Sequence, residues 1–253
     1  MNGQAITFDF HNTLATCPEW FELEVRRLPS GFLRWWADSR GPRFVNALAE
    51  EADFRYRDLR RDIIEHGNEL TAEACLATVF GAMSLTVPEA DVAAGVEHLM
   101  RGALAEVSPI PGAIEAVIAI HAAGVPVGVV SSAVYHPFLE WTLDSFGVQD
   151  AIQVVITSAS AGYYKSRPEL YWHAAERLGV APDRIVHVGD SLRFDVAGAG
   201  KAGMGTVWLQ GNGAVPGDGS ARPDLTLRSL EAAAPDILSL LKTRLATLNR
   251  SDG

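Results

Sequence analysis

The sequence predicts an α/β protein in which a parallel sheet is covered by helices and interrupted by one helical insertion. Three observations lead to this prediction. Strand-like and helix-like segments alternate in the second part of the chain, a glycine follows each of these helices, and the stretch between residues 17 and 107 has helical periodicity only.

The predicted strands are short runs rich in β-branched residues. They are Ala5–Phe10, Val125–Val130, Ile152–Thr157, Ile185–Val188 and Gly205–Leu209. From the second strand onward they alternate with amphipathic helices, which is the order of elements in a Rossmann-like parallel sheet.

The helices of this alternation have clear ends. We expect them at Gly112–Ala123, Pro137–Phe146, Pro168–Leu178 and Asp195–Ala202. The glycines that follow them are Gly124, Gly147, Gly179 and Gly203. Glycine is favoured there because a helix commonly ends in a left-handed residue, which glycine adopts without steric penalty.

The insertion begins soon after the first strand. Its helical patterns cover Trp20–Arg27, Phe44–His66, Thr71–Met83 and Pro88–Leu104, and Pro109–Gly112 is typical of a linker. We therefore predict a core domain made of residues 1–15 and 108–253, with a helical cap domain over residues 16–107. Residues after about Thr247 are expected to form a frayed tail.

Composition and net charge indicate a folded protein and disfavour some classes of binding partner. Hydrophobic residues make up 48% of the 253 residues, which is enough for a folded core. The net charge of -10 disfavours nucleic acid and anionic membrane as partners. The basic run Arg55–Arg61 alternates with acidic residues at helical spacing, so we expect an exposed, salt-bridged helix face.

The cysteines and the hydropathy pattern favour a cytoplasmic protein. Cys17 and Cys75 lie far apart without neighbouring ligand residues, which suggests neither a zinc site nor a disulfide framework. We expect no signal peptide, because Met1–Gln4 leads straight into a strand-like run without a basic segment, an apolar stretch and a cleavage site. We expect no membrane segment, because no apolar run reaches about 20 residues. The oligomeric state leaves no signature in the sequence.

Chemistry-bearing residues stand at the ends of the predicted strands. Asp9 ends the first strand, Ser131 the second, Lys165 follows the third, and Asp190 and Asp195 follow the fourth. Ligands of open parallel sheets bind beyond the carboxyl ends of the strands, so these residues are expected to face one cleft. Taken alone, each of them is better explained as a turn residue, a helix cap or a solvated charge.

Taken together, the same residues indicate phosphoryl transfer. Three carboxylates in one cleft repel one another unless a cation lies among them, and oxygen-only ligands suit Mg²⁺ better than zinc. A carboxylate nucleophile, a metal, a lysine and a small hydroxyl are the groups that this reaction requires.

Four motifs then resemble those of the haloacid dehalogenase-like hydrolases. Asp9–Leu14 is similar to their D-x-D-x-T-L motif, Val127–Ser131 to the strand that ends in Ser or Thr, Lys165–Pro168 to K-P-x-P, and Gly189–Asp195 to G-D-x-x-x-x-D. The motifs occur in the family's order and cover the whole predicted core. The insertion between the first two resembles the helical C1 type of cap.

The resemblance implies a phosphatase that acts on a small phosphorylated metabolite. Asp9 would attack phosphorus and form an aspartyl-phosphate, which water then hydrolyses. Ser131 and Lys165 would hold the phosphoryl oxygens. Asn12 and Thr13 would support the loop.

The same resemblance implies a set of metal ligands. Mg²⁺ would bind the carboxylates of Asp9 and Asp190 and the backbone carbonyl of His11, with Asp195 acting directly or through water. His11 itself departs from the family pattern, which usually has a second Asp at this position. An imidazole can act as both acid and base near neutral pH, so His11 is our candidate acid/base residue, with a structural role as the alternative.

Other functions stay open. A 2-haloacid dehalogenase, a phosphomutase and a catalytically impaired binding or regulatory module are the alternatives, and the first is disfavoured by Asp190 and Asp195. A phosphonate hydrolase needs a cap lysine, whereas the lysines here are Lys165, Lys201 and Lys242, all outside the predicted cap. The sequence assigns no substrate-selecting role to any cap residue, and His187 is expected to be a core residue.

Overall fold

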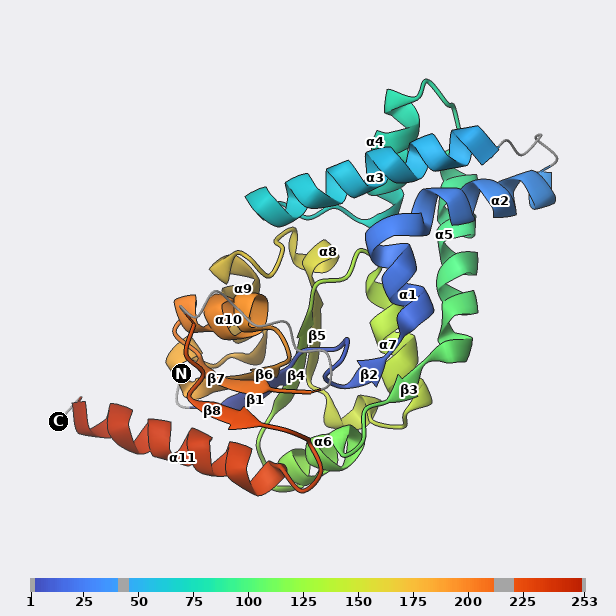
Figure 1. Ribbon diagram of the computed structural model, residues 1–253. Helices are drawn as coiled ribbons and strands as arrows, with labels where there is room; N and C mark the ends of the chain where they lie inside the picture. The colour runs from blue at the N-terminus through green and yellow to red at the C-terminus, as the bar shows by residue number, and fades with distance from the viewer. Residues whose placement is uncertain (1–2, 41–45, 212–220, 252–253) are drawn as a thin grey trace.

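The computed structural model describes residues 3–40, 46–211 and 221–251, and its centre is a six-stranded parallel sheet with helices on both faces (Figure 1). The strand order is β5-β4-β1-β6-β7-β8. The strands are β1 Ala5–Phe8, β4 Val127–Ser131, β5 Val154–Thr157, β6 Ile185–Gly189, β7 Gly205–Leu209 and β8 Leu225–Leu227. The predicted α/β class with a Rossmann-like sheet is confirmed.

β1 lies in the middle of this sheet. It pairs in parallel with β4 through Ile6 and Val127, and with β6 through Ala5 and Ile185. Its four residues are all buried, as expected for a central strand with both faces covered. The chain therefore leaves β1 at the middle of the carboxyl edge, next to the ends of β4 and β6.

Helices pack on the two faces of the sheet as two hydrophobic clusters. The larger one includes Val117 of α6, Phe138 of α7 and Ile237 of α11. The second includes Ala174 of α9 and Ala199 of α10. The helices are α6 Ala113–Ala122, α7 His136–Ser145, α9 Pro168–Leu178, α10 Ala197–Lys201 and α11 Ala234–Ser251.

The glycine stops are confirmed at two representative helices. Gly179 ends α9 with φ of 68° and Gly203 follows α10 with φ of 91°. Both angles lie in the left-handed region, which explains why glycine occupies these positions.

The segment between β1 and β4 is mainly helical. It contains α1 Pro18–Glu22, the π-helical turn η1 Leu23–Arg27, α2 Leu28–Arg40, α3 Asn46–His66, α4 Ala72–Ala82, α5 Glu89–Ala103 and the short turn η2 Leu104–Glu106. These helices pack on one another, with α2 against α3 and α5. They extend beyond the carboxyl edge of the sheet in Figure 1. The domain boundary at residues 15/16 and 107/108 stays a prediction.

A two-stranded antiparallel ladder lies at the base of this helical segment. β2, Ala15–Thr16, pairs with β3, Ser108–Pro109. The predicted linker at Pro109 is thus partly a strand, because the outgoing and returning chain pair side by side.

Several further elements differ from prediction. α2, β8 and α11 were not predicted, and α11 continues to Ser251 where a frayed tail was expected after Thr247. The buried side chains of Ile237 and Leu241 dock the first half of α11 on the sheet, and the helix continues from this packed start to Ser251. The remaining short helices are η3 Gln149–Ala151, α8 Ser158–Ala161, η4 Pro182–Arg184 and η5 Leu192–Val196.

The helix predicted at Asp195 begins earlier than expected. The turn η5 starts at Leu192, and Ser191 caps it by accepting a hydrogen bond from the Phe194 backbone N–H at 3.2 Å. Asp195 therefore lies inside a π-helical turn, with its side chain free to enter the cleft. Within the described part of the chain, no helix combines the length and apolar character that a membrane crossing requires.

Candidate active site

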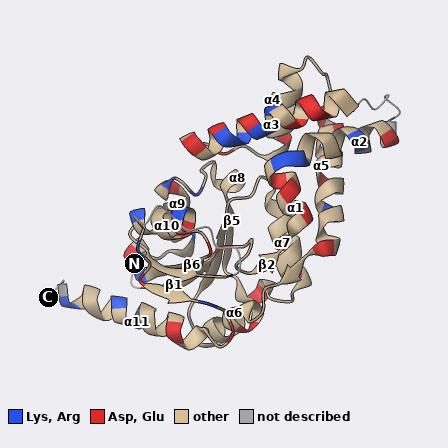
Figure 2. Cartoon of the chain, viewed as in Figure 1, with Lys and Arg blue, Asp and Glu red and all other residues tan. Residues whose placement is uncertain are grey.

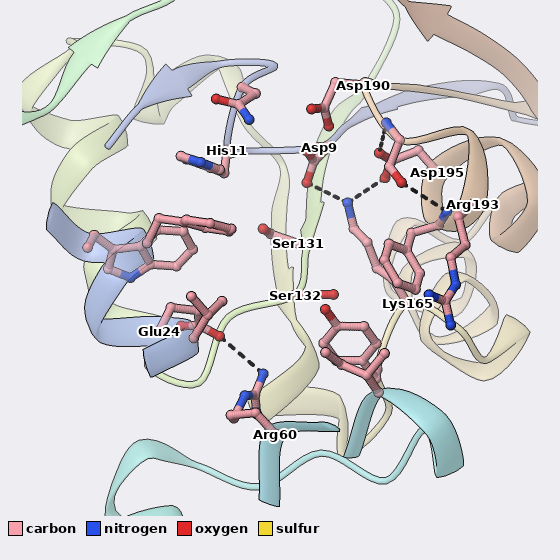
Figure 3. A pocket seen from close by; sticks show the side chains of 18 of the residues that line it. Asp9, His11, Glu24, Arg60, Ser131, Ser132, Lys165, Asp190, Arg193 and Asp195 are labelled. Carbon is pink, nitrogen blue, oxygen red and sulfur yellow. Dashed lines mark hydrogen bonds and ion pairs between the residues drawn. The ribbon is translucent and has the colours of Figure 1, made fainter. Parts of the chain in front are cut away.

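A pocket of about 640 Å³ opens at the carboxyl edge of the sheet, between the core and the inserted helices (Figure 3). Most of the predicted site residues line it: Asp9, His11, Asn12, Ser131, Lys165, Asp190 and Asp195. The remaining one, Thr13, lies just behind and donates a hydrogen bond to Asp9 Oδ2 at 3.4 Å. The structure therefore brings together residues that lie up to 186 positions apart, from Asp9 to Asp195.

Asp9 is held at the end of β1. Its backbone N–H donates to the Val188 carbonyl of β6 at 2.8 Å, which continues the parallel ladder by one residue. Asn12 follows with φ of 61°, a left-handed conformation that Asn tolerates better than most residues. This tight turn sends the chain back, so the Asp9 carboxylate remains at the floor of the pocket.

Lys165 lies between two carboxylates. Its Nζ donates to Asp9 Oδ1 and, at 2.5 Å, to Asp195 Oδ1, and all three side chains are buried. Burial opposes the charge on this amine, but Asp195 and Asp9 outweigh it and raise the pKa of Lys165 above its usual range. The lysine is therefore a fixed positive charge at the pocket floor.

Gly189 makes room for this arrangement. A Cβ at this position would lie 2.3 Å from Asp195 Cγ, so a side chain here would displace the carboxylate. The close approach also lets Asp195 Oδ2 accept the Ser191 backbone N–H at 2.9 Å. Gly189 and the backbone N–H of Ser191 thus fix the position of the Asp195 carboxylate.

Three carboxylates gather around the lysine. Asp9, Asp190 and Asp195 each offer one oxygen, and these atoms lie within 4.8 Å of one another. Burial, followed by the neighbouring acids, raises the pKa of Asp9 to about 8 and that of Asp190 to about 6. At Asp195 the effect of burial is outweighed by Lys165 and His187, which hold its pKa below the usual range.

This donor set fits a hard divalent cation. Its ligands are oxygens only, and a cation among them would relieve the repulsion that raises the pKa of Asp9 and Asp190. The residues present therefore fit the metal that the sequence resemblance implies.

His11 lies on the side of Asp9 opposite Lys165 in Figure 3. Its ring stacks on Phe21 with centroids 4.6 Å apart, and Nδ1 lies 3.0 Å from Cys17 Sγ. Burial lowers the pKa of His11 to about 4, so the neutral imidazole prevails at neutral pH. With Nδ1 engaged by the thiol, Nε2 is the nitrogen left for a ligand.

A second buried charge cluster, which the sequence did not reveal, lines the pocket from the inserted helices, the side named here the cap side after the predicted cap. Arg60 of α3 donates to Glu69 and, at 3.4 Å, to Glu24 of η1. Glu24 also accepts the Val134 backbone N–H at 3.0 Å, three residues after Ser131. Ser158 donates to Glu69 at 2.8 Å. The cluster joins the inserted helices to the loops that follow β4 and β5.

This cluster corrects the prediction for the basic run Arg55–Arg61. Arg55 and Arg61 do form exposed pairs, with Glu51 and Asp58. Arg60, however, is only 4% exposed. The difference arises because α3 turns this position toward the core, where two acidic partners far away in sequence meet it.

His187 supports the site from inside the sheet. It is fully buried on β6, as predicted, and its Nε2 lies 3.1 Å from Asp195 Oδ1 while Nδ1 lies 2.9 Å from Thr7 Oγ1. Burial lowers the pKa of His187, which favours the neutral ring. A neutral ring that accepts from Thr7 can donate to Asp195 and orient it.

The fold and the site together define an α/β protein of the Rossmann-like class with an acidic centre at the carboxyl edge of its parallel sheet. A sequence profile of haloacid dehalogenase-like hydrolases matches residues 4–203. The chain belongs to this family and is an enzyme of the hydrolase class.

Individual relatives agree with this assignment. The glyceraldehyde 3-phosphate phosphatase of Methanopyrus kandleri is 34% identical over 120 residues, which are 47% of this chain and 51% of that protein. The match thus spans about half the length of this relative.

Solved structures extend the likeness to nearly the whole fold. The crystal structure of a HAD phosphatase from Thermococcus onnurineus superposes with a TM-score of 0.62 at 25% identity and covers 93% of this chain and 97% of that one. A 2-haloacid dehalogenase from Pseudomonas syringae pv. Tomato DC3000 has a TM-score of 0.67 at 22% identity, covers 94% and 98%, and therefore shares the fold.

Proposed function

We propose that this hydrolase is a phosphatase that cleaves a small phosphorylated metabolite through an aspartyl-phosphate on Asp9. The observation that carries the proposal is the buried contact of Asp9 with Lys165 beside two further carboxylates. This arrangement combines a nucleophile with a fixed positive charge for the phosphoryl oxygens, which is what phosphoryl transfer requires. The inserted helices would act as its cap domain.

The chain's own residues supply both halves of the reaction. An Asp9 carboxylate oxygen attacks phosphorus, a new O–P bond forms, and the bond from phosphorus to the leaving oxygen breaks. Water then attacks the same phosphorus, which releases phosphate and restores the carboxylate. Ser131 and Lys165 bind the phosphoryl oxygens throughout, while Thr13 and Asn12 hold the Asp9 loop in place.

A magnesium ion fits the acidic centre. Asp9, Asp190 and the His11 backbone carbonyl would hold it, with Asp195 bound directly or through water. When bound, it neutralises negative charge on the transferring group.

His11 is the proposed acid/base residue. Its ring lines the pocket, and Nε2 is left for the proton that moves to the leaving oxygen or from the attacking water. The lowered pKa of His11 favours the base role at neutral pH. A dianionic phosphoryl group near the ring favours the protonated form and therefore the acid role.

A screen of phosphorylated metabolites, run with Mg²⁺ and with EDTA, tests the function. We expect inorganic phosphate to be released with Mg²⁺ and release to stop in EDTA. Glyceraldehyde 3-phosphate belongs in the screen because of the Methanopyrus relative's name. Chloride released from a 2-haloacid in EDTA, with no phosphate released from any ester, would replace the proposal by a dehalogenase.

A further inference from the structure

The pocket is larger than the phosphoryl site alone requires. Its volume of about 640 Å³ falls in the range of roughly 300–1,000 Å³ that accommodates a drug-sized ligand. The groups proposed to hold the phosphoryl group, Asp9, Ser131 and Lys165, occupy only the floor. The rest of the space must be matched by the leaving group of the substrate.

The upper part of the pocket is basic, although the chain carries a net charge of -10. Arg26, Arg57 and Arg61 line it from the inserted helices and Arg193 lines it from η5. Figure 2 shows basic residues along α3 and at the turn that precedes α2. Away from the acidic floor, the acidic residue among the described lining is Glu24; it pairs with Arg60, and burial raises its pKa to about 8, which disfavours its negative charge.

These four arginines differ in how their charge is used. Arg26 pairs with Glu22 and Arg61 with Asp58, both at the exposed surface. Arg57 and Arg193 are also exposed. Within the described part of the chain, neither forms an ion pair. Burial raises the pKa of nearby Asp53, and the charge of Arg57 acts to lower it. The Arg193 guanidinium lies over the Phe194 ring, 5.0 Å from its centroid, and this contact does not consume its N–H donors. Both guanidinium groups can therefore donate to a ligand.

The two available arginines come from the two sides of the pocket. Arg57 belongs to α3 of the inserted helices, and Arg193 belongs to the turn that carries Asp195. In Figure 3 the Arg193 side chain extends from the Asp195 side of the pocket toward the cap side. An anion between them would be held from both sides, and guanidinium groups bind carboxylate and phosphate through paired hydrogen bonds.

We propose that the substrate is a phosphomonoester that carries a second anionic group, a carboxylate or another phosphoryl, which Arg57 and Arg193 bind. This inference rests on the proposed phosphatase function and narrows its substrate class. The second anion selects the substrate, whereas the floor of the pocket performs the reaction. A three-carbon phosphate with a neutral remainder would fill the pocket poorly and leave both arginines unused.

Three six-carbon substrates of similar size test the proposal. Glucose 6-phosphate has no second anion, 6-phosphogluconate adds a carboxylate, and fructose 1,6-bisphosphate adds a phosphoryl group. With Mg²⁺ present, we expect at least one charged substrate to exceed glucose 6-phosphate by about tenfold in kcat/KM, mainly through KM. The two charged compounds distinguish carboxylate from phosphoryl recognition.

Variants assign the preference to the two arginines. In the double variant Arg57→Gln/Arg193→Gln, the ratio of kcat/KM between charged and uncharged substrates should fall toward one. Arg55→Gln is the matched control, because Arg55 lies on the same helix, pairs with Glu51 and does not line this pocket. Equal kcat/KM for all three substrates in the unmodified enzyme, or a preference that survives the double variant, overturns the proposal.

The design separates this inference from the proposed function. Hydrolysis of all three substrates without a charge preference contradicts the second-anion site alone. Absence of hydrolysis of any phosphate ester contradicts the phosphatase proposal, and calorimetric binding of the same three compounds then still measures anion preference. Equal affinities in that measurement would reject the second-anion site as well.

Discussion

The floor and the cap side of the pocket are built from the same type of cluster. At the floor, Lys165 lies between Asp9 and Asp195, and on the cap side Arg60 lies between Glu24 and Glu69. Each is one buried cation between two buried carboxylates. The two clusters differ in the further partners of their carboxylates.

The cap cluster is completed by the protein itself. Glu24 accepts the Val134 N–H, and Glu69 accepts the Leu70 N–H at 2.9 Å and the Ser158 hydroxyl. The floor cluster has a third carboxylate, Asp190, whose pKa is raised by burial and by Asp195. The excess negative charge at the floor can bind a cation and, with it, a reacting group. The carboxylates of the cap cluster already have partners within the protein, so this cluster is suited to holding the helices in place.

The strongest test of this comparison changes the floor. Asp9→Asn keeps the shape of the side chain but removes the proposed nucleophile, so we expect kcat for phosphate release to fall by roughly 10⁴- to 10⁶-fold. Single-turnover assays with the best substrate of the screen measure it. Thermal unfolding is the control, because the fold should persist. Phosphate release that survives the substitution at an undiminished rate would remove Asp9 from the mechanism.

His11 gives the next largest effect on the floor. His11→Ala should lower kcat by about 10²- to 10⁴-fold, the usual contribution of a positioned acid or base. A base must be unprotonated, so with saturating Mg²⁺, which relieves the raised pKa of Asp9, kcat/KM of the unmodified enzyme should fall as pH drops through about 4, the pKa of His11 in the free enzyme. His11→Asp, which restores the usual family residue, should recover activity. Full activity of His11→Ala across the pH range would make the ring structural.

The difference between the two clusters also explains why the floor residues could be predicted from the sequence and the cap cluster could not. The floor residues stand in short motifs at strand ends, and topology alone brings strand ends to one edge, so Asp9, Ser131, Lys165, Asp190 and Asp195 could be grouped in advance. Helices with strong periodicity and glycine stops were predicted for the same reason. Both kinds of signal are local in sequence.

The cap cluster had no such signal. Arg60 follows Glu24 by 36 positions, and its burial depends on how α3 rotates against η1 and on the loop after β4. Nothing in the run Arg55–Arg61 distinguishes Arg60 from its exposed neighbours. The short strand β8 was missed because three residues give too little pattern to separate a strand from a loop.

Breaking the cap cluster should cost stability more than chemistry. Arg60→Met leaves Glu24 and Glu69 buried without their counter-charge, and removing one partner of a buried pair typically costs about 3–5 kcal/mol of unfolding free energy. Denaturant titration measures this loss. Arg61→Met on the same helix, whose pair with Asp58 is exposed, should change stability by less than about 0.5 kcal/mol. Equal losses in the two variants would show that the cluster contributes nothing beyond a surface pair.

The smallest expected effect concerns the orientation of the Asp195 carboxylate at the floor. His187→Leu removes the ring that lies between Thr7 and Asp195, so Asp195 loses a fixed donor and can rotate away from the acidic centre. Partners that orient metal-binding residues typically contribute about 10- to 100-fold to metal affinity or activity, and we expect about tenfold weaker Mg²⁺ binding by calorimetry. Thr7→Val is the matched control, because it leaves the contact with Asp195 intact and should weaken Mg²⁺ binding less. Unchanged Mg²⁺ affinity in His187→Leu, with only a lower melting temperature, would assign His187 to core packing alone.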